Sequence, residues 1–176
     1  MADSELAAGD VLKKLQGIHV HKATGLRNAD CHSESDPYFI CRIGSLGSSW
    51  SEKAKEIYDL KFISKTIPDN NDPEWDVKFE FDIDDYLDQY SSGENDLEDE
   101  GLELNLTIYD KDRMRDDELG SVTVPIPKEC LGEDHFGSPP LVTHVPLTGK
   151  KAQGNVTISF YMRDGLKPEL KNCRTL

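Results

Sequence analysis

The sequence predicts an all-β protein, an eight-stranded antiparallel β-sandwich of the Greek-key kind. Eight short stretches alternate apolar with polar residues, which is the period of strands that bury one face. The connections between these stretches are long, and the chain shows no paired helical pattern. Because each strand has one apolar face that a second sheet must cover, these observations predict two packed sheets. At 176 residues the chain is long enough for one well-buried domain and short for two.

The first predicted strand places Ile18 and Val20 inward and His19 and His21 outward. We interpret both histidines as surface strand residues rather than metal ligands, because no third ligand lies at a suitable spacing in the sequence. The acidic stretch 84–101 is expected to be a solvated loop. In chain order, the predicted strands are residues 17–23, 38–43, 61–67, 77–83, 102–109, 122–126, 141–147 and 155–162.

The fifth predicted strand is expected to bury one face and to end where a run of aspartates begins. Asp110 and Asp112 lie two residues apart, so a continuing strand would send both carboxylates to one side, roughly 7 Å apart. Crowded carboxylates raise one another's pKa, and a hard cation with oxygen ligands removes that cost. The loop, which also holds Asp116 and Asp117, therefore predicts a calcium site; a solvated acidic hairpin is the alternative.

A second acidic loop, residues 26–38, contains Asp30 and Asp36 and is a candidate to face the first. An EF-hand starting at Asp110 is excluded, because Met114 occupies the fifth ligand position and Arg115 the sixth, where the sharp turn requires glycine. A calcium site in this chain must therefore be assembled from separate loops.

The formal net charge of -14 restricts the possible partners. A chain this acidic repels nucleic acid and anionic lipid alike, so we expect no nucleic-acid partner. Docking to an anionic membrane needs local basic residues or a bound cation that inverts the sign of the docking face. Calcium would supply that charge.

The domain is expected to span residues 15–162, between a flexible N-terminal segment, 1–14, and a C-terminal tail, 163–176. The first ten residues lack the basic start and apolar core of a secretory signal, and no stretch approaches the length of a membrane span. We therefore expect a cytosolic protein, and a monomer, whose four cysteines are free thiols. We find no nucleophile elbow, phosphate-binding glycine loop or catalytic histidine motif, and we expect no enzyme activity.

Several motifs in a fixed order resemble the C2 domain, over residues from about 15 to 162. They are GIHVHKATGL at 17–26, SDPYF at 35–39, NDPEW at 71–75, YDKD and DDELG within 109–120, and GNVTISF at 154–160. The resemblance implies calcium-binding loops at one end of the sandwich. It also implies the type II strand order, which closes with the strand 155–162.

By the same resemblance, five acidic ligands are carried over onto this chain: Asp30, Asp36, Asp110, Asp112 and Asp117. Asp116 is a further candidate, because the stretch from Asp112 to Asp117 is one residue shorter than in many calcium-binding members. Either Asp116 or Asp117 takes the last ligand position. The carbonyls of Ala29 and Lys111 resemble the backbone ligands of the family.

Candidate membrane contacts lie in the loop after the fifth predicted strand, where Arg113 and Arg115 are expected to meet anionic head groups while Met114 enters the interface. Lys61 and Lys65 are either ordinary edge-strand lysines or a lipid-contacting patch. The last four residues, starting at Cys173, fit the spacing of a prenylation box, with a plain solvated tail as the alternative.

The sequence therefore favours a calcium-dependent phospholipid-binding module that moves from the cytosol to anionic membranes when calcium rises. Two alternatives remain at this stage. One is a calcium-independent interaction or scaffold domain, and the other is a regulatory fragment of a larger lipid-signalling enzyme.

Overall fold

The computed structural model describes residues 13–29, 33–45, 47, 60–82, 102–126 and 141–165. Within these ranges every regular element is a strand, and no helix has the length and apolar character that a membrane crossing requires. The strands are β1 (Lys13–Thr24), β2 (Pro37–Ser45), β3 (Lys61–Ile63), β4 (Glu74–Asp82), β5 (Leu102–Asp110), β6 (Asp117–Pro125), β7 (Leu141–Pro146) and β8 (Asn155–Gly165).

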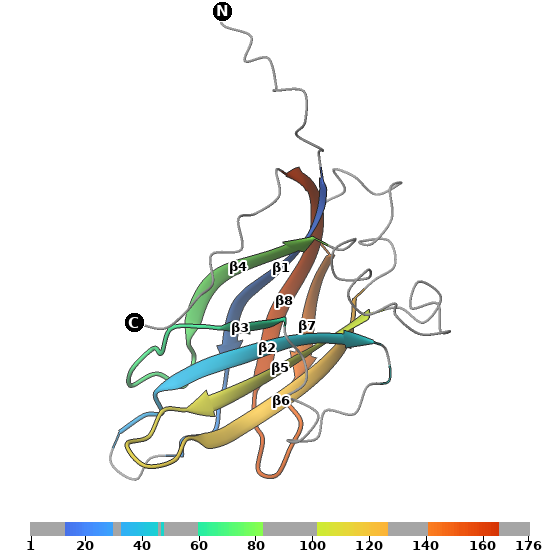
Figure 1. The fold of residues 1–176 in the computed structure, drawn as a ribbon. Helices are drawn as coiled ribbons and strands as arrows, with labels where there is room; N and C mark the ends of the chain where they lie inside the picture. The colour runs from blue at the N-terminus through green and yellow to red at the C-terminus, as the bar shows by residue number, and fades with distance from the viewer. Residues whose placement is uncertain are drawn as a thin grey trace, which may run out of the picture.

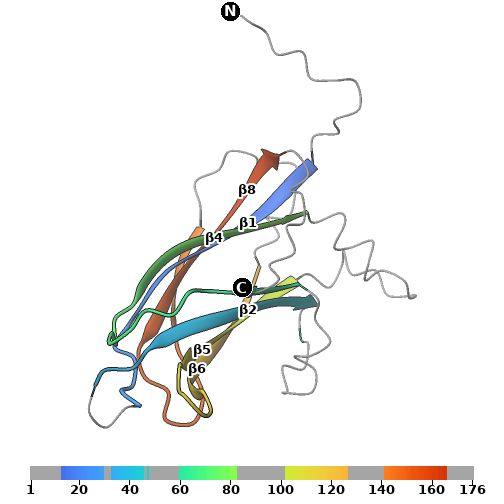
Figure 2. The ribbon, with the colours of Figure 1, turned by 60° about the vertical axis from the view of Figure 1, so that its left-hand side comes forward.

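The described residues form two antiparallel four-stranded sheets, which confirms the predicted sandwich. One sheet has the order β4-β1-β8-β7 and the other the order β3-β2-β5-β6. Figure 2 shows the two layers, with β4, β1 and β8 in one and β2, β5 and β6 in the other. The last described strand, β8, lies between β1 and β7, which is the closing position that the type II arrangement requires.

The core lies between the sheets and is built from the inward side chains of both. On β2, Phe39 is fully buried and packs edge-on against Trp75 and Phe79 of β4, with ring centroids 5.0 and 5.9 Å apart. Leu106 and Ile108 of β5 are also fully buried. Edge-to-face rings contribute about 1 kcal/mol per pair beyond their area burial, so this contact fixes how β2 packs on β4.

The prediction that β5 buries only one face is wrong. Its polar residues Glu103, Asn105 and Thr107 are also buried, with exposed fractions of 5, 3 and 0%. Asn105 donates to Thr123 Oγ1 on β6 at 3.2 Å and accepts from Thr107 Oγ1 at 3.3 Å. Because these amide and hydroxyl groups are hydrogen-bonded to one another, burying them does not carry the full cost of desolvation.

The third predicted strand is shorter than expected, since β3 ends at Ile63 rather than at residue 67. The chain beyond it still follows β2: the N–H groups of Ser64 and Ile67 donate to the carbonyls of Phe39 and Pro37, both at 3.0 Å. An edge strand this short exposes few unpaired backbone groups to another chain.

Several predictions lie outside the described residues. They concern the segment 1–12, Asp30, the acidic stretch 84–101, and the tail beyond residue 165 with Cys173. The strands β1 and β8 themselves extend to Lys13 and Gly165, slightly beyond the expected domain bounds of 15 and 162. Among the described residues, Cys41 is a free thiol; it is buried, and burial raises its pKa above the ordinary value.

Candidate functional site

Three loops meet at one end of the sandwich, at the lower left of Figure 1. They are the described parts of the β1–β2 loop (25–29 and 33–36), the segment between β3 and β4 (64–73) and the β5–β6 loop (111–116). The strand order produces this gathering, because β2 and β5 are antiparallel neighbours and Pro37 at the start of one is paired with Asp110 at the end of the other. Acidic residues that are far apart in the sequence therefore come to one place.

Asp110 is the most enclosed of the described candidate ligands, with 1% of its surface exposed. Its Oδ1 accepts a hydrogen bond from the backbone N–H of Asp36 at 2.6 Å. Next to it, the N–H of Lys111 donates to the carbonyl of Asp36 at 3.0 Å, which ties the two loops together. The other carboxylate oxygen, Oδ2 of Asp110, is buried and has no hydrogen-bond partner in the described structure.

An unpaired, buried carboxylate oxygen is costly, since leaving such a group unsatisfied costs about 1 to 3 kcal/mol and more when it is charged. A bound cation would satisfy it. At the same end of the sandwich, Asp36, Asp112 and Asp117 offer carboxylate oxygens, which are the ligands of a hard ion such as Ca²⁺ and not of a thiolate-seeking metal. The donor set at Asp110 therefore fits calcium.

The segment between β3 and β4 supports the β1–β2 loop, a role that the sequence does not reveal. The backbone N–H of Asp69 donates to Oδ1 of Asp36 at 2.8 Å. Asn71 accepts from the N–H of Ser35, and Asp72 accepts from the N–H of Gly25 at 2.6 Å. The NDP turn in the sequence marks a bend there, but only the fold shows that the segment before it supports the candidate ligand Asp36 through Asp69.

Ala29 lies in the β1–β2 loop, where hydrogen bonds to Ser35 hold its backbone in place. Its N–H donates to Oγ of Ser35 at 3.0 Å, and the same hydroxyl donates to the carbonyl of Arg27 at 3.3 Å. Ser35 is fully buried, so this part of the loop is fixed from inside. Arg27 also donates from Nη2 to the carbonyl of Glu118 at 3.1 Å, which joins the β1–β2 loop to β6.

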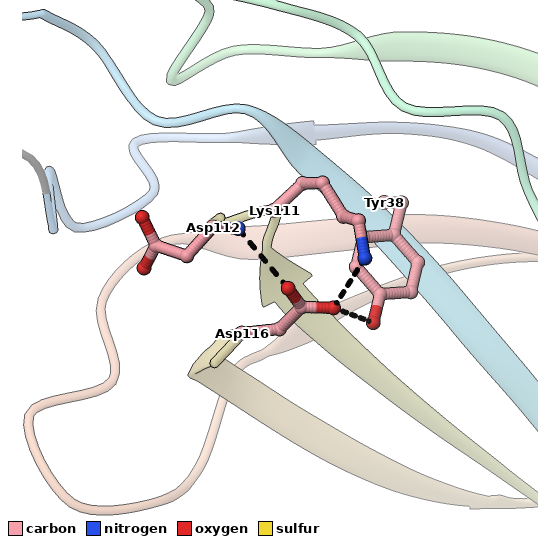
Figure 3. Close-up of polar contacts among 4 residues, drawn as sticks. All are labelled: Tyr38, Lys111, Asp112 and Asp116. Atoms are coloured by element: carbon pink, nitrogen blue, oxygen red, sulfur yellow. Dashed lines mark hydrogen bonds and ion pairs between the residues drawn. The ribbon is translucent and has the colours of Figure 1, made fainter. Parts of the chain in front are cut away.

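Asp116 is held by three donors, as Figure 3 shows. The hydroxyl of Tyr38 and Nζ of Lys111 reach its Oδ2 at 2.7 and 3.0 Å, and the N–H of Asp112 reaches its Oδ1 at 3.0 Å. Burial alone would raise the pKa of Asp116, but these hydrogen bonds outweigh that effect and hold the pKa below its ordinary value. The carboxylate is thus engaged inside the protein.

Asp117, the neighbouring candidate, is arranged differently. It begins β6, is exposed, and pairs with Asp110 in the strand register. In the part of the chain that the structure describes, its carboxylate makes no hydrogen bond. Asp112 lies exposed in the same loop. The structure therefore brings Asp36, Asp110, Asp112 and Asp117 to one end of the sandwich, and Asp30 lies outside the described residues.

The tip of the β5–β6 loop carries the predicted lipid-contacting residues. Arg113 and Arg115 are exposed, and Met114 is 99% exposed, the largest value among the exposed large hydrophobic residues of the described ranges. Lys61 and Lys65 are also exposed, and Lys61 belongs to β3, an edge strand. The basic residues at the tip and those at the sheet edge thus form two separate groups on the chain.

Comparison with known proteins identifies the family to which the chain belongs. A family model described as "C2 domain" matches residues 15–141. A "Calcium-dependent lipid-binding protein" from Arabidopsis thaliana is 26% identical over 166 residues, which covers 91% of this chain but only 28% of that protein. The chain therefore spans about a quarter of that relative's length.

Two solved structures show the same fold. Human GIVD cytosolic phospholipase A2 has a TM-score of 0.58 at 23% identity, covering 90% of this chain and 17% of that enzyme chain. The C2A domain of plant Extended Synaptotagmin 1 has a TM-score of 0.59 at 14% identity, covering 89% of this chain and 99% of that one. Since the family model matches most of the chain and the two sheets superpose on a solved C2 domain, the chain belongs to the C2 domain family.

Proposed function

We propose that this chain is a calcium-dependent module that binds anionic phospholipid membranes. Its calcium ligands are Asp36, Asp110, Asp112 and Asp117, with Asp30 completing the acidic set. The carbonyls of Ala29 and Lys111 add backbone oxygens. In the cell, the module is cytoplasmic at low calcium and becomes peripheral to the membrane when calcium rises.

The observation that carries this proposal is the buried oxygen of Asp110. Oδ2 has no hydrogen-bond partner in the described structure, while Oδ1 is held by the N–H of Asp36. A lone structural carboxylate would be expected to find donors for both oxygens, whereas a metal ligand keeps one oxygen for the ion. The name of the Arabidopsis relative, which includes calcium and lipid, supports the same assignment.

Charge explains why calcium would control the membrane. The chain has a formal net charge of -14, and the loop end gathers several carboxylates, so without an ion this end repels an anionic surface. Bound calcium neutralises the carboxylates, and Arg113 and Arg115 at the exposed tip then leave that end locally positive. The exposed Met114 lies between them and adds a small apolar contact.

Sedimentation with vesicles tests the proposal. The full chain is mixed with phosphatidylserine-containing or pure phosphatidylcholine vesicles, with calcium or with a chelator. We expect binding only to the anionic vesicles and only with calcium. Asp110→Asn keeps Oδ1 as an acceptor for Asp36 and removes the charge, so it should fold normally yet lose both the binding and the calcium-induced rise in melting temperature.

Binding that survives the chelator, or that is equal on both vesicle types, would contradict this mechanism and favour a calcium-independent interaction domain. A wild-type melting temperature that millimolar calcium leaves unchanged would contradict the calcium site itself. At a calcium concentration of 100 Kd, the expected stabilisation is about 2.7 kcal/mol.

A further inference from the structure

A second cluster of candidate metal ligands lies away from the loop end, on the outer face of the β4-β1-β8-β7 sheet. His19 and His21 of β1 and Asp76 of β4 each offer one ligand atom, and these atoms all lie within 4.8 Å of one another. Along the sequence, no third ligand lies near the two histidines. The fold supplies the third ligand from a different strand.

The pair His19 and Asp76 is already in contact. Nε2 of His19 lies 2.6 Å from Oδ1 of Asp76, and the histidine side chain is only 14% exposed. Two ligand atoms on one tetrahedral zinc ion lie about 3.3 Å apart, given metal–ligand distances near 2.0 to 2.1 Å. A separation change of less than 1 Å therefore lets an ion take the place of the proton between these two groups.

The backbone brings the two histidine rings together. In a regular strand, side chains two residues apart are separated by roughly 7 Å. Here the ring centroids of His19 and His21 are 3.7 Å apart. The pairing register of β1 shifts between Val20 and Lys22 against both β4 and β8, so His21 lies at the irregularity. Such bulges re-aim a side chain and are over-represented next to functional sites.

Asp76 itself has an unusual backbone. Its φ of 49° places a residue other than glycine in the left-handed region, inside a strand. Asp and Asn tolerate this conformation better than other side chains, but it remains uncommon. The residue is exposed, so this conformation is not explained by burial of its side chain. Its consequence is that the carboxylate meets His19.

His21 is fixed from the other side. Its Nε2 is hydrogen-bonded to Oγ of Ser159, a buried residue of β8. Metal-binding histidines commonly have their ring orientation set by a hydrogen bond of this kind. Strands on both sides of β1 thus contribute, β4 through Asp76 and β8 through Ser159.

We propose that His19, His21 and Asp76 form a binding site for a divalent transition-metal ion of the zinc class. Two imidazoles and one carboxylate are a donor set that suits zinc, with water in the fourth position. The ion would join β1 to β4 across the sheet face. The site shares no residue with the aspartate loops, and the proposal does not depend on calcium binding there.

Titration calorimetry with Zn²⁺ tests it, using the full chain after chelator treatment and dialysis. An excess of Ca²⁺ is present throughout to compete for the loop carboxylates. We expect one Zn²⁺ per chain, and a weakening of roughly tenfold or more in each of Asp76→Asn and His21→Gln. Asp76→Asn is the safer variant, because asparagine keeps the size of the side chain and tolerates the left-handed backbone.

His144→Gln is the matched control. His144 lies on β7 of the same sheet, where its Nδ1 is hydrogen-bonded to Thr157, and it is not part of the three-residue cluster. This variant should bind Zn²⁺ as the wild type does. A Co²⁺ absorption spectrum separates the site from adventitious cysteine binding, because thiolate ligands give intense charge-transfer bands and imidazole and carboxylate do not.

Wild-type affinity in Asp76→Asn would overturn the proposal, whatever the fate of His21→Gln. Thiolate bands in the Co²⁺ spectrum of the wild type, or an equal loss of affinity in His144→Gln, would also overturn it.

Discussion

The two clusters of candidate ligands lie on different parts of the sandwich and are held in different ways. The loop cluster, Asp36 and Asp110 with their neighbours, lies at strand ends and is joined mainly through backbone N–H groups. The face cluster, His19, His21 and Asp76, lies within strands and is joined side chain to side chain. The first leaves a buried oxygen unpaired, whereas in the second the potential ligands already contact one another.

This difference indicates what each cluster can do. Loops at strand ends can present a bound ion to a surface outside the protein, because the described residues 112–115 at the tip are exposed. Ligands in the middle of a sheet are held by neighbouring strands, so an ion there acts mainly on the stability of the sheet. The loop cluster is therefore the one that should control membrane binding.

The largest expected effect tests that assignment. Arg113→Ala combined with Arg115→Ala should weaken binding to anionic vesicles by roughly tenfold to thirtyfold, because each basic contact near the surface contributes about 1 kcal/mol. Vesicle sedimentation at saturating calcium measures it. Met114→Ala should have a smaller effect, and higher salt should weaken the wild type in the same direction.

The matched control is Lys61→Ala with Lys65→Ala, which removes the same total charge from the sheet edge. If these lysines only protect an edge strand, membrane binding changes little. An effect as large as that of the arginine pair would instead place a lipid contact at the sheet edge, and the loop tip would then not be the only membrane-binding surface of the described residues.

A second prediction concerns the neighbouring residues Asp116 and Asp117. Asp117→Asn should weaken calcium binding on the order of tenfold, because the charge of the ligand set tunes affinity. Asp116→Asn should weaken it less, since three internal donors already occupy that carboxylate. Calorimetric titration with calcium measures both. The reverse ranking would show that Asp116 leaves Tyr38 and Lys111 to take the last ligand position.

The smallest expected effect comes from the donor side of the same contact. Tyr38→Phe removes the hydroxyl that donates to Asp116 but keeps the ring that stacks on Tyr109, with centroids 5.5 Å apart. The free energy of unfolding without calcium should fall by about 1 kcal/mol, the usual net value of one hydrogen bond. Urea denaturation measures this change.

Tyr109→Phe is the control for that experiment. It preserves the same ring stack, and within the described structure its hydroxyl makes no hydrogen bond. It should leave the urea midpoint nearly unchanged. Equal losses in both variants would attribute the stability to the rings rather than to the bond with Asp116.

The sequence predicted those features that depend on neighbouring residues. The alternation of Ile18, Val20 and their counterparts marks the strands, and the aspartates from Asp110 onward mark the loop, because both signals are local. Burial on the polar face of β5 was not predictable, since the alternation of Asn105 and Thr107 with leucines is the same whether that face is covered or open.

Contacts between side chains on different strands were also not predictable from the sequence. Asp76 meets His19 only because β4 pairs with β1 and both strands are irregular at that point. Likewise, Asp116 differs from Asp117 because it accepts a hydrogen bond from Tyr38, which lies on β2. In each case the missing information was which strands pair with each other. The spacing of residues within one motif does not contain that information.

The pairing of β1 with β8 has a consequence for how the chain is made. Lys13 pairs with Gly165 and Thr24 with Asn155, so the first of the described strands has the last of them as a neighbour. Synthesis proceeds at about 5 to 20 residues per second, which puts roughly 4 to 15 s between Asp82, the end of β4, and Asn155. If β1 pairs with β4 before β8 is made, the other side of β1 is an open edge during that interval, and an open edge is a template for pairing with other chains until β8 covers it.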